Sequence, residues 1–202
     1  TTRQPQTQTQ TTPRPAKPDS HGFRVTSLRE REKVCVGGTF DQLHSGHKLL
    51  LTVCACLAAS PTNAKDTPDA NDSQDPKIGS IVLGLSAGEL LVNKTHKELI
   101  QPYETRRKRV VEFLAEVEPD VKVEVHELHD AFGPSVSMED LTTLVVSQET
   151  SKGGSMVNDE RARRGLSRLK NVVVDLVQDD GTKAIKVSST TIRSYLANQI
   201  TL

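Results

Sequence analysis

Residues 33–59, KVCVGGTFDQLHSGHKLLLTVCACLAA, are the stretch from which the fold is most readily inferred. Its first part, KVCVGG (33–38), is a short apolar run that ends in two glycines, as a buried strand does. From 46 to 59 nearly every position is apolar, which predicts a helix that is buried on nearly all of its faces. A strand, a turn and a helix in this order form the first half of a βαβ unit.

The remainder of the chain continues this alternation. Strands are predicted at 80–86, 121–128, 141–147 and 172–177, and helices at 102–117, 157–169 and 189–197. Such a pattern predicts an α/β fold with a Rossmann-like, mostly parallel sheet and helices on both faces. Ligands of these sheets bind in the crevice at the carboxyl ends of the strands. Functional residues are therefore expected in the turns that follow strands.

Two polar segments stand apart from this pattern. Residues 1–20 contain almost no apolar side chains, and 60–77 are rich in Pro, Asp, Asn and Ser. Segments of this kind bury too little apolar surface to offset the chain entropy that is lost on ordering. We therefore expect a disordered tail at 1–20 and a single domain at 21–202, with a flexible surface insertion at about 60–77.

Composition argues against several classes of protein. The 202 residues carry a formal net charge of zero, and only 3% of them are aromatic, which disfavours nucleic-acid binding by bulk charge or base stacking. No apolar run approaches the ~18 residues of a membrane-spanning helix. Cys35, Cys54 and Cys56 are odd in number and lack the spacing of a disulfide framework. Reduced thiols are typical of a cytoplasmic protein, so that location is expected.

The first turn, GGTFDQLHSGH (37–47), carries groups that suit phosphate binding. Gly37 and Gly38 lack a Cβ atom, so the backbone is free to turn tightly and to approach a ligand. The amides and the dipole at the start of the following helix favour anions. His44 and His47 lie three residues apart, where two imidazoles are able to donate to phosphate oxygens and to stabilise transition-state charge.

Simpler explanations exist for each of these features taken alone. Thr39 and Asp41 add a hydroxyl and a carboxylate beside the histidines, but a glycine pair after a strand is often only a turn. Two histidines would also suit a metal, although the nearest third ligands, Asp41 and Glu89, have no clear spacing. The strand–turn–helix context of the whole motif favours phosphate binding, with no metal ligands from protein side chains.

A second candidate site is KVSSTTIR (186–193), which opens the last predicted helix. Ser188, Ser189 and Thr190 offer hydroxyls and N-terminal amides to phosphate oxygens. Arg193 lies one turn further along and carries a fixed fork of donors. Alone, the pattern also describes an ordinary Ser/Thr-capped surface helix. Two phosphate-binding helix starts in one domain would suit a triphosphate.

Basic residues between the two motifs are less distinctive. Lys94 follows the second predicted strand, so it is expected at the same edge of the sheet. A lysine there would neutralise an attacking phosphate that otherwise repels a triphosphate, although loop lysines are commonly only solvated. The cluster RRKR (106–109) is expected to be mostly a solvated helix face.

These segments together resemble a known family. GGTFDQLHSGH matches the (T/H)xGH signature of the nucleotidylyltransferase superfamily, and KVSSTTIR resembles its second signature, of the ISSTxIR kind. The middle segments LLVNK, ELIQPY, LVVSQET, GG and N-x-x-R resemble the eukaryotic, CoA synthase-like form of phosphopantetheine adenylyltransferase. The likeness extends from about residue 33 to 197 and implies the nucleotidylyltransferase fold.

The resemblance also implies a reaction. ATP and 4'-phosphopantetheine would give dephospho-CoA and pyrophosphate in coenzyme A biosynthesis, with Mg²⁺ on the phosphates and a possible association with other enzymes of that pathway. The implied catalytic residues are His44, His47, Lys94 and Arg193. The implied ATP-binding residues are Gly37, Gly38, Thr39, Phe40, Asp41, His47, Ser188, Ser189 and Thr190. The implied acceptor-binding residues are Thr39, Lys94, Asn158 and Arg161.

Two observations and two alternative functions qualify this resemblance. The family often has a tyrosine where this chain has Phe132, and no GxxxxGK(S/T) phosphate loop of a kinase occurs in the sequence. A related transferase that acts on nicotinamide mononucleotide or an alcohol phosphate remains an alternative, although cytidylyltransferases usually differ at KVSSTTIR. A nucleotide-binding module without catalysis is a further alternative, which the presence of His44, His47 and Lys94 disfavours.

Overall fold

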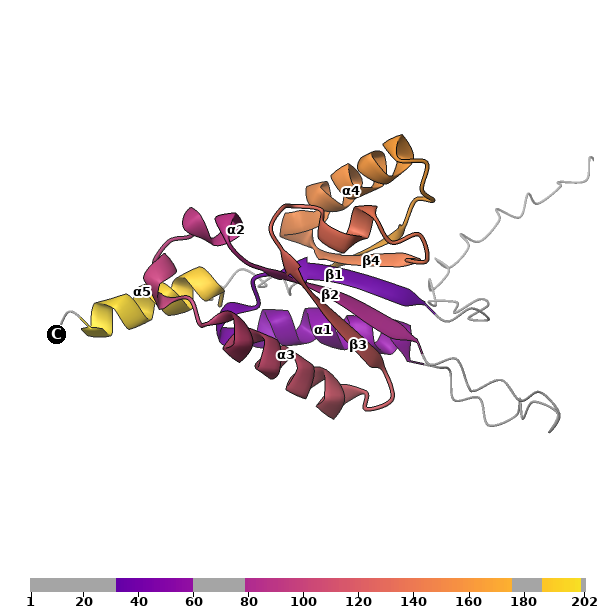
Figure 1. Ribbon diagram of the computed structural model, residues 1–202. Coiled ribbons are helices and arrows are strands. Elements are labelled where there is room, and N and C mark those ends of the chain that lie inside the picture. Colours follow the sequence, from indigo (N-terminus) through magenta and orange to yellow (C-terminus); the bar gives the residue numbers. More distant parts are fainter. Residues whose placement is uncertain (1–31, 60–78, 176–186, 201–202) are drawn as a thin grey trace, which may run out of the picture.

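The computed structural model describes residues 32–59, 79–175 and 187–200 (Figure 1). Its strands are β1 (Lys33–Gly38), β2 (Ser80–Ser86), β3 (Lys122–Leu128), β4 (Thr143–Ser147) and β5 (Lys170–Val174). They form one sheet in the order β3-β2-β1-β4-β5, and every pairing is parallel. The predicted tail at 1–20 and the predicted insertion at 60–77 lie outside the described residues.

Helices cover both faces of this sheet, because side chains alternate along each strand. On β1, Val34 and Val36 face α1 (Ser45–Ala58) and α3 (Tyr103–Val117) in one apolar cluster. Cys35, between them, belongs to a second cluster with Val157 of α4 (Ser151–Arg163). Figure 1 shows α1 and α3 on one side of the sheet and α4 on the other. The predicted α/β, Rossmann-like fold is confirmed.

Shorter elements complete the described chain. Helix α2 (Glu89–Val92) follows β2, and α5 (Ser189–Ile200) extends from the same end of the sheet as the first turn (Figure 1). Four 3₁₀ segments are found among the described residues, at Asp41–Leu43, Lys97–Leu99, Gly133–Val136 and Gln148–Thr150. Two of them, Asp41–Leu43 and Gln148–Thr150, directly precede helices that begin at the carboxyl edge of the sheet.

Two expectations about the helices are wrong. The helix predicted at 157–169 begins earlier, at Ser151. A capping box between Ser147 and Thr150 starts the helical segment, and Gly153 and Gly154 are part of the helix. It ends before Gly165, whose positive φ of 75° stops a helix. Helix α1 is also not buried on all faces: Leu51 is fully covered, whereas Leu49 is 38% exposed.

Candidate active site

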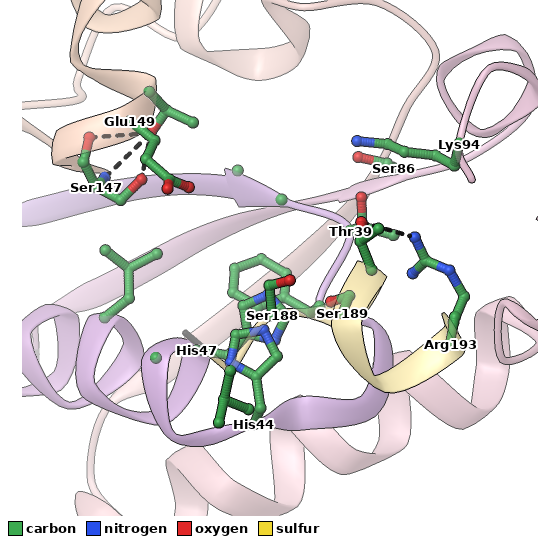
Figure 2. Close-up of a pocket in the computed structure, with 18 residues that line it drawn as sticks. Thr39, His44, His47, Ser86, Lys94, Ser147, Glu149, Ser188, Ser189 and Arg193 are labelled. Atoms are coloured by element: carbon green, nitrogen blue, oxygen red, sulfur yellow. Dashed lines mark hydrogen bonds between the residues drawn. The ribbon is translucent and has the colours of Figure 1, made fainter. Parts of the chain in front are cut away.

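A cavity of about 350 Å³ opens at the carboxyl ends of the strands (Figure 2). Its walls are the β1–α1 turn, the end of β2 with the loop after it, the end of β4, and the start of α5. Among the residues predicted from the sequence, it brings together Gly37, Gly38, Thr39, Phe40, His44, His47, Lys94, Ser188, Ser189, Thr190 and Arg193. Asp41, Asn158 and Arg161 do not line it. The location agrees with the rule for ligand sites in parallel sheets.

The sharp turn after β1 is made by non-glycine residues. Gly37 and Gly38 complete the strand, and neither has a positive φ. The left-handed positions are Phe40, at φ 47°, and Gln42, at φ 57°. The expectation that the glycine pair makes the turn is therefore wrong. Their small size still matters, since a Cβ on Gly38 would lie 3.1 Å from the Phe40 ring. Left-handed non-glycine residues store strain, which proteins concentrate at functional sites.

His44 and His47 form a stacked pair at the start of α1. Their ring centroids are 3.9 Å apart, and the Phe40 ring lies 5.2 Å from that of His47. The Nδ1 atom of each imidazole is buried and has no hydrogen-bond partner among the described residues. A buried polar nitrogen without a partner costs about 1–3 kcal/mol, and such groups in native proteins call for an explanation such as a bound ligand.

The electrostatic environment keeps this histidine pair neutral. Burial, and to a smaller extent the neighbouring His44, lowers the pKa of His47 to about 3. Burial also lowers the pKa of His44, and the Asp41 carboxylate opposes that change. Two adjacent imidazoles also repel each other when both are charged, so this arrangement disfavours the doubly protonated pair. Phosphate oxygens would reverse this preference, because negative charge nearby favours the protonated imidazole.

Asp41 serves the fold of the turn and is not accessible to a nucleotide. Its side chain is fully buried, and its Oδ2 accepts a hydrogen bond from the Arg193 guanidinium at 2.6 Å. Its Oδ1 accepts from the backbone N–H of Gln101 at 3.0 Å. Asp41 does not line the cavity, so its predicted contact with ATP stays a prediction that this geometry does not support. The carboxylate holds the first turn against two other segments of the chain.

The start of α5 presents the second motif to the cavity. The Ser188 hydroxyl accepts from the Thr191 backbone N–H at 3.1 Å, as an N-cap does. The Ser189 hydroxyl donates to the Asp41 carbonyl oxygen at 2.8 Å, which fastens the second motif to the first. Ser188, Ser189 and Thr190 all line the cavity (Figure 2). The positive end of the α5 dipole therefore faces the same space as that of α1.

On the opposite wall, Lys94 extends from the loop after β2. It is exposed and lines the cavity together with Thr39 and with Ser86, the last residue of β2 (Figure 2). The backbone beneath is fixed by Arg106 of α3, whose guanidinium donates to the carbonyl oxygens of Thr39 at 2.8 Å and Ser86 at 3.1 Å. Arg106 is 1% exposed, so the expected solvated face of the RRKR cluster does not include it.

Sequence reasoning assigned no role to the end of β4. Ser147, Glu149 and Thr150 line the cavity there, and Ser86 lines it from β2. The Ser147 hydroxyl hydrogen-bonds the Thr150 hydroxyl at 3.0 Å, so this rim is held in place by its own capping box. The segment LVVSQET was noticed as part of the resemblance, and its position after an apolar strand is the signal that would have identified it.

Asn158 and Arg161 lie elsewhere, within the packing of α4. The Arg161 guanidinium donates to the carbonyl oxygens of Ser135 at 2.7 Å, Met138 at 2.9 Å and Ser167 at 2.6 Å. Asn158 donates to the Leu169 carbonyl oxygen at 3.0 Å and accepts from its N–H at 2.7 Å. Neither residue lines the cavity, so their predicted role in acceptor binding stays a prediction that this geometry does not support.

Two further properties concern metals and membranes. Within the part of the chain that the structure describes, no group of three or more His, Cys, Asp or Glu side chains is placed to hold a metal ion. Among residues 32–59, 79–175 and 187–200, no helix has both the length and the apolar character that crossing a membrane requires.

Comparison with known proteins reveals relatives over most of the chain. Phosphopantetheine adenylyltransferase of Saccharomyces cerevisiae is 36% identical over 181 residues, which cover 88% of this chain and 50% of that protein. The protein of the same name from Thermococcus kodakarensis is 35% identical and covers 83% of this chain and 88% of its own length. That of Pyrococcus furiosus is 34% identical, with 83% and 91% covered. The chain thus spans about half the length of the yeast relative.

Solved structures support the fold alone. A protein of unknown function from Archaeoglobus fulgidus has a TM-score of 0.53 and 23% identity, and the match covers 72% of this chain and 100% of that one. No family model matches the sequence. The archaeal relatives, however, align over nearly their whole length, and the resemblance inferred from the motifs is confirmed. The chain belongs to the phosphopantetheine adenylyltransferase family.

Proposed function

We propose that this chain transfers the adenylyl group of ATP to 4'-phosphopantetheine and releases dephospho-CoA and pyrophosphate. One observation carries the proposal: two helix starts, two imidazoles with partnerless Nδ1 atoms and Lys94 surround a single cavity. These are groups that bind phosphates and stabilise their charge. Family membership supports this acceptor, since the relatives are named for phosphopantetheine.

The reaction would be a direct in-line displacement at phosphorus. A phosphate oxygen of 4'-phosphopantetheine attacks the α-phosphorus of ATP, and a new P–O–P linkage forms. The bond between the α-phosphorus and the α,β-bridging oxygen breaks, and pyrophosphate leaves with that electron pair. The nucleophile belongs to the acceptor, so the protein needs no covalent intermediate. Catalysis then consists of positioning and charge stabilisation.

Each wall of the cavity has a separate task in this proposal. His44 and His47, with the amides that open α1, would stabilise charge on the oxygens around the α-phosphorus. Ser188, Ser189 and Thr190 would hold the remaining ATP phosphates at the positive end of α5. Thr39 and Lys94 would hold the acceptor phosphate, where the ammonium offsets its repulsion from the triphosphate.

The metal, the partners and the location are part of the same proposal. Mg²⁺ would enter on the ATP phosphates as part of the substrate, bound chiefly by phosphate oxygens and water. Dephospho-CoA needs a kinase to phosphorylate it further, so association with other enzymes of the pathway is expected. The three cysteines are free thiols, which supports a cytoplasmic location. We also propose that 21–202 form one domain.

Pyrophosphate release from Mg·ATP tests the proposal when three acceptors are compared in parallel. We expect release with 4'-phosphopantetheine and none with nicotinamide mononucleotide or glycerol 3-phosphate. Mass spectrometry of the product would identify dephospho-CoA. Release with a different acceptor would overturn the proposed substrate. A folded sample that binds ATP and releases pyrophosphate with none of the three would contradict the enzymatic proposal and favour a nucleotide-binding module.

A further inference from the structure

Arg193 occupies a junction of three segments around the cavity. Its side chain is 2% exposed, although the residue is part of the cavity wall. We infer that Arg193 is a positioning residue, which fixes the spacing between the first turn, the Lys94 loop and the start of α5. This role replaces the phosphate contact expected from the sequence, and it rests on the proposed function for its effect on turnover.

The contacts of the guanidinium carry this inference. Its Nη1 donates to the Asp41 carboxylate at 2.6 Å, in the first turn. Its Nε donates to the carbonyl oxygen of Thr95 at 2.9 Å, directly after Lys94. Its Nη2 donates to the Thr190 hydroxyl at 3.3 Å, within the second motif. Every nitrogen of the side chain is therefore engaged with a different segment.

The chemistry of arginine suits this task. The guanidinium is planar and rigid, so three donors in fixed directions set three acceptors at fixed separations. The ion pair with Asp41 is buried on both sides, at 2% and 0% side-chain exposure, where losing either partner leaves an uncompensated charge. A lysine would preserve the charge but would not span the acceptors, because its ammonium is a single point.

These three segments carry the groups that would hold the two substrates. Next to the contacts of Arg193 in the chain lie residues that line the cavity. In the first turn this residue is Phe40, and in the loop after β2 it is Lys94. At the start of α5, Ser189 and Thr190 line the cavity. The Ser189 hydroxyl bonds the Asp41 carbonyl oxygen, which ties α5 to the first turn a second time. Arg193 thus fixes the distance between the side of the cavity that would hold the acceptor and the side that would hold ATP. An error of about 1 Å in such a distance can reduce the rate by about 100-fold.

A double-mutant cycle with Asp41 separates positioning from phosphate contact. We expect Arg193→Gln and Asp41→Asn each to lower kcat by about 100-fold, with little change in the KM for ATP. The double variant should be no worse than either single variant, because both remove the same buried pair. Additive losses, or a loss confined to the KM for ATP, would overturn the inference. Arg168→Gln is the control, since its exposed pair with Asp159 lies on the surface.

Hydrogen exchange of the nucleotide-free protein tests the same inference without turnover. Arg193→Gln should speed amide exchange in 39–43 and in 94–99, although the substitution lies in α5. Unchanged exchange in both segments would overturn the positioning role. If the wild-type protein transfers no adenylyl group but the variant exchanges faster, the proposed function fails and the positioning role stands. If Arg193→Gln does not fold, Arg193→Lys takes its place, because the lysine retains the positive charge beside Asp41. Arg193→Lys should show a smaller loss of kcat and a smaller rise in amide exchange than Arg193→Gln.

Discussion

The β1–α1 turn and helix α4 both carry polar residues that resemble family motifs, yet the structure uses them differently. In the turn, the Nδ1 atoms of His44 and His47 are buried without a partner among the described residues. In α4, the Arg161 guanidinium donates to the carbonyl oxygens of Ser135, Met138 and Ser167. In the first region the fold leaves hydrogen-bonding atoms unused beside the cavity, whereas in the second the backbone accepts bonds from every nitrogen of the guanidinium.

This difference separates functional from structural polar groups. A buried polar atom without a partner costs stability, so its persistence points to a ligand that supplies the partner. A buried arginine whose donors meet backbone carbonyl oxygens stabilises the fold, and Arg161 makes four such bonds away from the cavity. Residues of the first kind should affect turnover when they are replaced, whereas residues of the second kind should affect the free energy of unfolding.

The largest effect is expected from His47→Ala. Because this imidazole should stabilise charge mainly in the transition state, its loss should lower kcat by about 100- to 1,000-fold while the melting temperature does not fall. Steady-state kinetics and a thermal melt measure the two quantities. His129→Ala is the matched control, since that imidazole is 66% exposed on the surface and should not affect turnover. Wild-type rates in His47→Ala would contradict the assignment.

The opposite outcome is expected from Arg161→Met. Four backbone carbonyl oxygens would lose a donor, and we expect a loss of about 3 kcal/mol in the free energy of unfolding. For a domain of this size that lowers the melting temperature by roughly 6–12 °C. Turnover per folded molecule should not change. A stable Arg161→Met variant with a raised KM for the acceptor would show instead that the arginine binds substrate.

A smaller effect concerns acid stability. The pKa of His47 is lowered to about 3 in the folded protein, whereas an unfolded histidine titrates near its ordinary value. The unfolded state therefore binds more protons between these values, and stability is lost as the pH falls through that window. The slope is at most about 1.4 kcal/mol for each pH unit. Urea unfolding at pH 7 and pH 5 should show a shallower pH dependence for His47→Asn than for the wild type, and equal slopes would contradict this.

The smallest effect is expected at Lys94. This side chain is exposed and would act on the acceptor through charge alone, so Lys94→Ala should raise the KM for 4'-phosphopantetheine by about 10-fold. Lys97→Ala is the control, because Lys97 is also exposed and does not line the cavity. Equal effects of the two substitutions would show that only the general charge of the loop matters.

Local patterns predicted the sheet well and the buried arginines poorly. The bounds of β1 and β2 follow from apolar runs that end at glycine or serine, and both were predicted correctly. The RRKR cluster was expected to be mostly a solvated face, and its member Arg106 is buried because it donates to Thr39 and Ser86, which are distant in sequence. Asn158 and Arg161 likewise bond other segments of the chain, which their own local pattern does not show. A sequence shows which residues carry donors, but long-range packing decides which donors the backbone uses.

Imidazole nitrogen NMR with Mg·ATP tests most directly whether the histidine pair receives phosphate. The ¹⁵N resonances of His44 and His47 should shift as Mg·ATP is added, in the direction of protonation, because phosphate oxygens raise the pKa of both rings. His96, His126 and His129 lie outside the cavity lining and serve as internal controls whose resonances should not move. Saturation of the protein with ATP while the signals of His44 and His47 remain in place would contradict the account.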